Sequence, residues 1–209
     1  MLPDSLKKNP QRVSELVSRA GLETVAVAVT FDPYTIKFTK EVNGKAGTLC
    51  AFDDSYEHAV DQVREIAKLC MSLGVTLAIH PHVRTKVETI QQVEDILDRC
   101  KNYSPTLVFD SAHFTALGWD LSNFIKRFGK FISVAHIKDL KELVSPKDLD
   151  YERDFVDIGD GVVDFPRFIS ELKKVPYKGW LIVEVDNPKE KTVAASISKN
   201  YKRLSNLMI

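Results

Sequence analysis

The sequence has few cysteines, no long apolar run and no excess of charge of either sign. Its three cysteines, Cys50, Cys70 and Cys100, form no CxxC pair, which disfavours a zinc ribbon or a thioredoxin-like redox site. Cys70 and Cys100 fall in helical patterns, and we expect them to be small core residues in a reducing compartment. The apolar runs are far shorter than the roughly 20 residues of a membrane-spanning helix. Without an apolar segment typical of a secretory signal near Met1, a cytoplasmic protein is expected.

Charge and missing motifs narrow the classes of partner. The chain has 29 lysines and arginines and 29 aspartates and glutamates, so its formal net charge is zero. No basic surface for nucleic acid is therefore expected. No GxGxxG or GxxxxGK[ST] pattern follows a predicted strand, which disfavours dinucleotide-binding and P-loop folds. The sequence therefore favours a small-molecule partner over nucleic acid or a membrane.

Apolar runs alternate with amphipathic helical segments along the chain. The runs predict five strands at 24–30, 75–79, 106–109, 131–135 and 180–183. The helical patterns predict helices at 10–20, 54–73, 85–102, 120–128, 164–172 and 193–208, the third with a Thr85-x-x-Glu88 capping box. Residues 32–54 are expected to form a long connection, either a hairpin or an active-site loop, and 139–155 a polar loop. Apolar strands separated by helices indicate an α/β protein with a parallel sheet covered on both faces.

Side chains that can bind a metal follow four of these five runs. His80, Asp110, His136 and Glu184 each come directly after an apolar run, and His82 lies two residues beyond the first of them. One such residue is usually a cap or a satisfied polar group. Four of them at the carboxyl ends of parallel strands would meet at one mouth, where ligands bind in such sheets. The residue types suit one divalent ion, namely Mn²⁺, Co²⁺, Mg²⁺ or Zn²⁺.

Four motifs in these regions resemble those of the xylose isomerase-like TIM-barrel superfamily, which includes sugar isomerases, epimerases and 2-keto-myo-inositol dehydratases. They are LAIHPHVRT at 77–85 with Glu88-Thr89, FDSAH at 109–113 with Gly118, AHIKD at 135–139, and IGDGVVDF at 158–165 continuing through YKGW at 177–180 to Glu184. Each motif is short, but their order over residues 55–209 makes the resemblance specific.

The resemblance implies a role for each motif residue. Asp110, His136 and Glu184 would be metal ligands, and His80 would replace the glutamate that is the fourth ligand in many relatives. Because that glutamate is also one of two acid/bases in the epimerases, His82 or Glu184 would have to take over part of the proton transfer here. The expected substrate contacts are His113, Arg84 and Lys138.

The resemblance also implies a (β/α)8 TIM barrel that is incomplete at the N-terminus, with about five β/α units in a single domain over residues 1–209. A full barrel has about 250 residues. We favour the interpretation that 24–30 is the fourth barrel strand; alternatively it is the third, and 32–54 is a degenerate fourth unit. Either way two sheet edges would be open, and a homo-oligomer is one way to cover them.

The expected function is that of a metal-dependent isomerase or epimerase acting on a ketose or a related polyol-derived carbonyl compound. Such an enzyme removes a proton next to a metal-bound carbonyl. An inosose or dehydroshikimate dehydratase, which is a lyase, is a close alternative. A non-catalytic remnant that acts in assembly is a third hypothesis. A metal-dependent AP endonuclease on a related barrel is disfavoured, because binding a phosphate backbone requires a positive surface.

Overall fold

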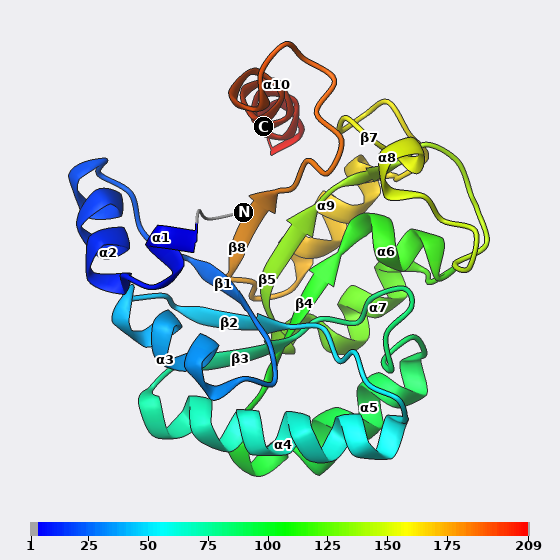
Figure 1. The fold of residues 1–209 in the computed structure, drawn as a ribbon. Helices are drawn as coiled ribbons and strands as arrows, with labels where there is room; N and C mark the ends of the chain where they lie inside the picture. The colour runs from blue at the N-terminus through cyan, green and yellow to red at the C-terminus, as the bar shows by residue number, and fades with distance from the viewer. Residues whose placement is uncertain (1–3, 209) are drawn as a thin grey trace.

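The computed structural model describes residues 4–208 and contains a curled sheet of six parallel strands with helices on its outer side (Figure 1). The strand order is β1-β2-β3-β4-β5-β8. The strands are β1 (Ala26–Val29), β2 (Ala46–Leu49), β3 (Thr76–Ile79), β4 (Thr106–Asp110), β5 (Ile132–Ile137) and β8 (Trp180–Val183). This arrangement confirms the prediction of an α/β fold built as an incomplete (β/α)8 barrel.

Helices between the strands cover the outer face of the sheet. The described helices are α1 (Asp4–Lys7), α2 (Pro10–Arg19), α3 (Pro33–Glu41), α4 (Tyr56–Leu73), α5 (Ile90–Arg99), α6 (Ser111–Ala116), α7 (Leu121–Phe128), α8 (Tyr151–Asp154), α9 (Phe165–Lys174) and α10 (Val193–Met208). Short 3-10 turns follow α5 and α7. Outward-facing strand residues such as Leu77, Ile79 and Phe109 join helix residues in the main hydrophobic core. The strand residues that face the other way form a smaller cluster inside the curl, made by Ala46, Ala78, Val108 and Val134.

One β/α unit was missed by the sequence prediction. Residues 32–54 are not a long connection, because they contain α3 and β2. The segment AGTL of β2 has one large apolar residue and a glycine, so it carries little strand signal. A Cβ atom at Gly47 would lie 3.1 Å from the Val29 side chain, which explains the small residue beside β1. The sheet therefore has six strands rather than five, and the alternative numbering, with β1 as third barrel strand, is the correct one.

The predicted cap of α5 was also wrong. Thr89 is the N-cap, and it forms a capping box with Gln92, whereas Thr85 and Glu88 lie in the preceding turn. The Thr85 hydroxyl accepts from the Val87 N–H. The pattern T-x-x-E/Q occurs twice in succession here, and only the second occurrence is followed by the buried face of a helix.

The segment 139–155 contains more structure than the predicted polar loop. β6 (Asp139–Leu140) and β7 (Phe155–Val156) form an antiparallel pair, and α8 lies between them. Leu140, Leu149 and Phe155 are buried beneath the charged residues of the segment. Three buried apolar side chains thus anchor a segment whose average composition is that of a solvated loop.

Asp139 ties this segment to the loop that carries the IGDG motif. Its carboxylate accepts hydrogen bonds from the backbone N–H groups of Leu140, Gly159, Gly161 and Val163, at 2.8–3.1 Å. A Cβ atom at Gly161 would lie 2.2 Å from the Leu140 carbonyl oxygen, so only glycine fits there. These hydrogen bonds join two of the four motifs, AHIKD at 135–139 and IGDGVVDF at 158–165.

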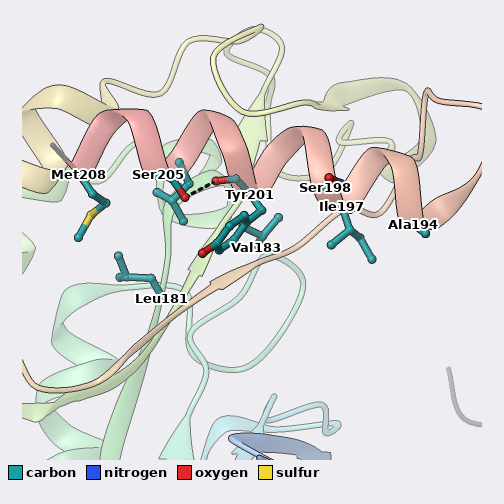
Figure 2. Close-up of a pocket in the computed structure, with 9 residues that line it drawn as sticks. Leu181, Val183, Ala194, Ile197, Ser198, Tyr201, Ser205 and Met208 are labelled. Atoms are coloured by element: carbon teal, nitrogen blue, oxygen red, sulfur yellow. Dashed lines mark hydrogen bonds between the residues drawn. The ribbon is translucent and has the colours of Figure 1, made fainter. Parts of the chain in front are cut away.

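The sheet is open between β1 and β8, which are its two edges (Figure 1). β8 is apolar on both faces, yet Trp180 is 47% exposed. A groove of about 790 Å³ separates the outer face of β8, through Leu181 and Val183, from Ile197 and Tyr201 of α10 (Figure 2). None of the described helices is long and apolar enough to cross a membrane.

Candidate metal centre

The period-two alternation of the strands brings the predicted ligands together. Ala78 and Val108 point into the curl, so His80 and Asp110, two residues further on, point to the same side. His136 pairs with Asp110 in the register of β4 and β5. Glu184 follows β8, and its N–H donates to the Ile137 carbonyl. All four side chains therefore emerge at the carboxyl end of the sheet on its inner side.

Three of these residues could hold a metal ion by their spacing alone. One ligand atom each from His80, Asp110 and His136 lies within 4.8 Å of the other two. Asp110 Oδ2 is 3.5 Å from His80 Nε2 and 3.7 Å from His136 Nδ1. Glu184 Oε2 is 3.0 Å from the same His136 Nδ1. The cluster therefore has two imidazole nitrogens and two carboxylate oxygens available.

The hydrogen bonding of the four residues fits a bound cation. Seven side-chain atoms among the described residues are buried without a hydrogen-bond partner. Four of them are the facing atoms of this cluster: His80 Nε2, Asp110 Oδ2, His136 Nδ1 and Glu184 Oε2. These atoms lie 3.0–3.7 Å from their charge partners in the cluster but form no hydrogen bond of acceptable geometry, which buried polar atoms normally do, so the cluster indicates a site for an ion. The nitrogen and oxygen donors suit a divalent metal of intermediate softness.

Asp110 is held in one orientation by the helix that it caps. Its Oδ1 accepts from the N–H groups of Ala112 and His113 at 3.0 and 2.9 Å, which leaves Oδ2 facing the cluster. Burial by itself would raise the pKa of Asp110, but Lys138 and the surrounding histidines hold it well below its ordinary value. The side chain is thus an anion with one free oxygen at the centre of the cluster. The short helix α6, absent from the predicted elements, supplies this orientation.

The histidines divide into neutral and charged groups. Burial lowers the pKa of His80 to about 4 and lowers those of His82 and His113, so these imidazoles are neutral near pH 7. Burial also opposes the charge of His136, but Asp110 and Glu184 raise its pKa to about 9. Asp110 and Glu184 therefore favour a positive charge at His136 Nδ1, and a cation bound at this point would take the place of the proton.

Lys138 lies beside the cluster and is almost completely buried. Its Nζ is 3.3 Å from Glu184 Oε1, 2.9 Å from Asp186 Oδ2 and 3.2 Å from His113 Nε2. Burial alone would lower the pKa of Lys138, but Asp110 and the two other carboxylates raise it above its ordinary value. Sequence reasoning missed Asp186, although its place two residues after Glu184 puts it on the same face of an extended chain.

Aromatic rings form one wall of the site. The rings of His82 and His113 are 3.5 Å apart between centroids, and the Tyr151 ring is 6.0 and 5.7 Å from them. His82 Nδ1 donates to the Val83 carbonyl at 2.7 Å, so Nε2 is the nitrogen with a free lone pair. This wall contains Tyr151 from a segment that the sequence predicted to be a loop.

Arg84 contacts the segment that carries Tyr151. Its guanidinium donates to the backbone carbonyls of Lys147 and Leu149 and lies 5.9 Å from the Tyr151 ring. The residue has a φ of 62°, which is unusual for a side chain of this size. Arg84 therefore holds the segment that carries Tyr151, and a contact of Arg84 with substrate stays a prediction.

The three cysteines are free, and two of them are core residues as expected. Cys50 is different, because it follows β2 and its Sγ is 3.4 Å from His80 Nδ1. Burial, together with the negative charges of Asp110 and Glu184, raises the pKa of the Cys50 thiol to about 12. It is therefore a neutral thiol near the cluster.

Comparison with known proteins gives a family match over most of the chain. A family model described as "Xylose isomerase-like TIM barrel" matches residues 15–204. Among relatives, an inosose dehydratase of Geobacillus kaustophilus is 30% identical over 143 residues. The match includes 64% of this chain and 46% of that protein, so the chain spans about half the length of such a relative. An inosose dehydratase of Bacillus cereus is 25% identical over the same number of residues, with 64% and 48% covered.

Solved structures share the fold. The IolI protein, determined with a bound zinc atom, has a TM-score of 0.81 and 20% identity, with 96% of this chain and 81% of that chain covered. A probable 3-DHS dehydratase, AsbF of Bacillus anthracis, has a TM-score of 0.75 and 14% identity, with 95% and 82% covered. These likenesses establish the architecture.

Proposed function

The chain belongs to the xylose isomerase-like TIM-barrel family, and we propose that it is a metal-dependent enzyme acting on a sugar- or cyclitol-derived carbonyl compound. The observation that carries the proposal is the set of four facing, unpartnered atoms from His80, Asp110, His136 and Glu184. We propose these residues as the ligands of one divalent ion, Mn²⁺, Co²⁺, Mg²⁺ or Zn²⁺. The zinc atom bound by the IolI protein, which shares this fold, supports a metal in the proposed site. We also propose that residues 1–209 form a single domain.

The shared first step is removal of a proton from the carbon next to a carbonyl group. When bound, the ion would supply Lewis-acid polarisation of that carbonyl. His82 is proposed as the base, because its Nδ1–H is occupied by the Val83 carbonyl and Nε2 has a free lone pair. Its lowered pKa keeps that lone pair available near pH 7.

Lys138 and His113 are proposed to bind the substrate oxygens beside the ion. The Lys138 ammonium is buried among Glu184, Asp186 and His113, so its charge is little screened by water. It would stabilise negative charge that develops on an oxygen as the proton leaves. Glu184 is proposed as the second group in proton transfer; its Oε1, which contacts this ammonium, is the oxygen that does not face His136.

The second step decides the reaction class. In a dehydratase, the hydroxyl group on the next carbon leaves with a proton as water, and a carbon–carbon double bond forms. The inosose dehydratases among the relatives support this outcome at least as well as isomerisation. In an isomerase or epimerase, the proton returns to a different position or face. The location of His82 after β3 and of Glu184 after β8, on either side of β4 and β5, supports that second candidate.

An assay with and without metal tests the proposal. The purified protein is stripped with EDTA, reloaded with each of the four ions, and incubated with inososes, 3-dehydroshikimate and ketohexoses. We expect turnover only with metal; loss of water identifies a dehydratase, and a rearranged or inverted product identifies an isomerase or epimerase. A folded protein that neither retains metal nor turns over any of these compounds would contradict the proposal and favour a non-catalytic barrel.

A further inference from the structure

Cys50 has a position that neither the motifs nor the proposed ligand set explains. Leu49 and Ile79 are partners in the β2–β3 register, and the His80 N–H donates to the Leu49 carbonyl at 2.8 Å. Cys50 and His80 are therefore neighbours on adjacent chains, one residue beyond the strands. Thr48 and Cys50 share a side of the extended chain, as Ala78 and His80 do on the next. The thiol thus enters the curl beside the imidazole.

The two nitrogens of His80 have different environments. Nδ1 is 3.4 Å from Cys50 Sγ, within hydrogen-bond distance for sulfur. Nε2 is 3.5 Å from Asp110 Oδ2 and is one of the buried atoms without a hydrogen bond. Among the described residues, Cys50 is the one group that contacts Nδ1 through a hydrogen-bonding atom. The imidazole therefore has one nitrogen facing the cluster and one facing the thiol.

A neutral imidazole that binds an ion through Nε2 must carry its proton on Nδ1. Histidine ligands of metals almost always donate that second N–H to a carboxylate, a carbonyl or water, which fixes the tautomer and the ring orientation. The sulfur of a thiol is a weak acceptor, and here it stands where the stronger acceptor is usually found.

We propose that Cys50 is a positioning residue for the metal centre. Its Sγ accepts a hydrogen bond from the Nδ1–H of His80 and so presents the Nε2 lone pair to the ion. This inference rests on the proposed metal centre. The proposal gives a function to Cys50, which directly follows β2 in a β/α unit that contains none of the four family motifs.

Zinc affinity of the full chain tests the role. Metal-free wild type, Cys50→Ala, Cys50→Ser and Cys70→Ala are titrated with Zn²⁺ against a chromophoric chelator. We expect Cys50→Ala to raise the Kd for zinc by about tenfold. Cys50→Ser should stay within about threefold of wild type, because a hydroxyl accepts the same hydrogen bond. Cys70→Ala is the matched control, since it removes a buried thiol from α4.

The Co²⁺ absorption spectrum is a second readout. We expect the ligand-field bands of Cys50→Ala to shift and those of Cys50→Ser and Cys70→Ala to match wild type, without any sulfur-to-cobalt charge-transfer band. Such a band would show that Cys50 binds the ion directly and would overturn the positioning role. If Cys50→Ala does not fold, Cys50→Val replaces it, because valine also lacks an acceptor and fills the space of the thiol.

The outcomes separate the two proposals. If wild type binds zinc and folded Cys50→Ala binds it equally well, the positioning role is overturned and the metal centre stands. Equal weakening in the alanine and serine variants would likewise overturn it, since the hydroxyl should restore the hydrogen bond. If folded wild type binds none of Zn²⁺, Co²⁺, Mn²⁺ and Mg²⁺, the proposed metal centre fails and the inference fails with it.

Discussion

At the scale of single residues, the site depends on which atom of each side chain is already occupied. The Oδ1 atom of Asp110 caps α6, and Nδ1 of His82 donates to a backbone carbonyl, so only the other polar atom of each side chain is available to the site. The same division holds for His80 if Cys50 accepts its Nδ1–H. Function therefore depends on the local hydrogen bonds as much as on the residue types.

The first prediction concerns His136, whose Nδ1 lies between two carboxylates. We expect His136→Gln to reduce the bound metal from about one ion per chain to less than about a tenth, because one of four ligands is lost. Elemental analysis after dialysis measures this ratio. His58→Gln is the control, since His58 is an exposed histidine on α4; equal metal loss in both variants, or none in His136→Gln, would refute the assignment.

At the scale of elements, short segments with weak sequence signals carry the site. β2 brings Cys50 to the cluster, α6 orients Asp110, and α8 places Tyr151 against the histidines. None of these three was predicted, because α6 and α8 are too short for a helical period to be visible and the segment AGTL of β2 has little strand signal. The longer helices and the apolar strands were predicted within a few residues of their observed bounds.

The second prediction tests the corrected N-cap of α5. Thr89→Ala removes the hydroxyl that accepts the Gln92 N–H and should lower the free energy of unfolding by about 1 kcal/mol. Urea denaturation of the metal-free protein measures the change. The neighbouring exposed Gln91→Ala is the control and should stay within about 0.5 kcal/mol of wild type. A smaller effect for Thr89→Ala than for Gln91→Ala would argue against this cap.

At the scale of the whole molecule, the last helix is attached to the barrel by a polar network. Asp157, in the loop before α9, is 2.7 Å from Lys199 Nζ and accepts from Asn200 Nδ2 at 2.7 Å. Arg203 of the same helix donates to the Ile158 carbonyl. Leu204 is the one buried apolar side chain among the described residues of α10, whereas Ile197 and Tyr201 beside the groove are exposed, so these bonds are important for the position of this helix (Figure 2).

The third prediction is a pH dependence that arises from this network. Burial would raise the pKa of Asp157, but Lys199 and Asn200 outweigh it and hold the pKa below its ordinary value. A carboxyl whose pKa is lower in the folded state stabilises the fold above its unfolded pKa, and this contribution is lost as the pH falls through the folded value. We therefore expect Asp157→Asn to be less stable than wild type at pH 7 and the difference to shrink as the pH falls below about 4. Urea denaturation at several pH values measures both; a difference that grows on acidification would contradict the assignment.

The sequence by itself determined the parallel α/β architecture and the family. Continuous apolar strands require cover on both faces, and polar residues directly after such strands lie at the carboxyl edge of any parallel sheet. His80, Asp110, His136 and Glu184 were found by this argument, which needs only the order of residues along the chain. Their period-two relation to buried strand residues then put them on the inner side.

Only the tertiary structure decided which atoms face one another and which residues support them. Cys50 and His80 are separated by 30 positions, and Arg84 and Leu149 by 65, so their contacts arise from the register and curl of the sheet. The count of six strands was likewise decided by pairing, because β2 is recognised by its hydrogen bonds to β1 and β3 more than by its composition. The sequence pattern shows which faces of the strands and helices are apolar. The distances between side chains of different strands are set by long-range packing, and the chemistry of this site depends on those distances.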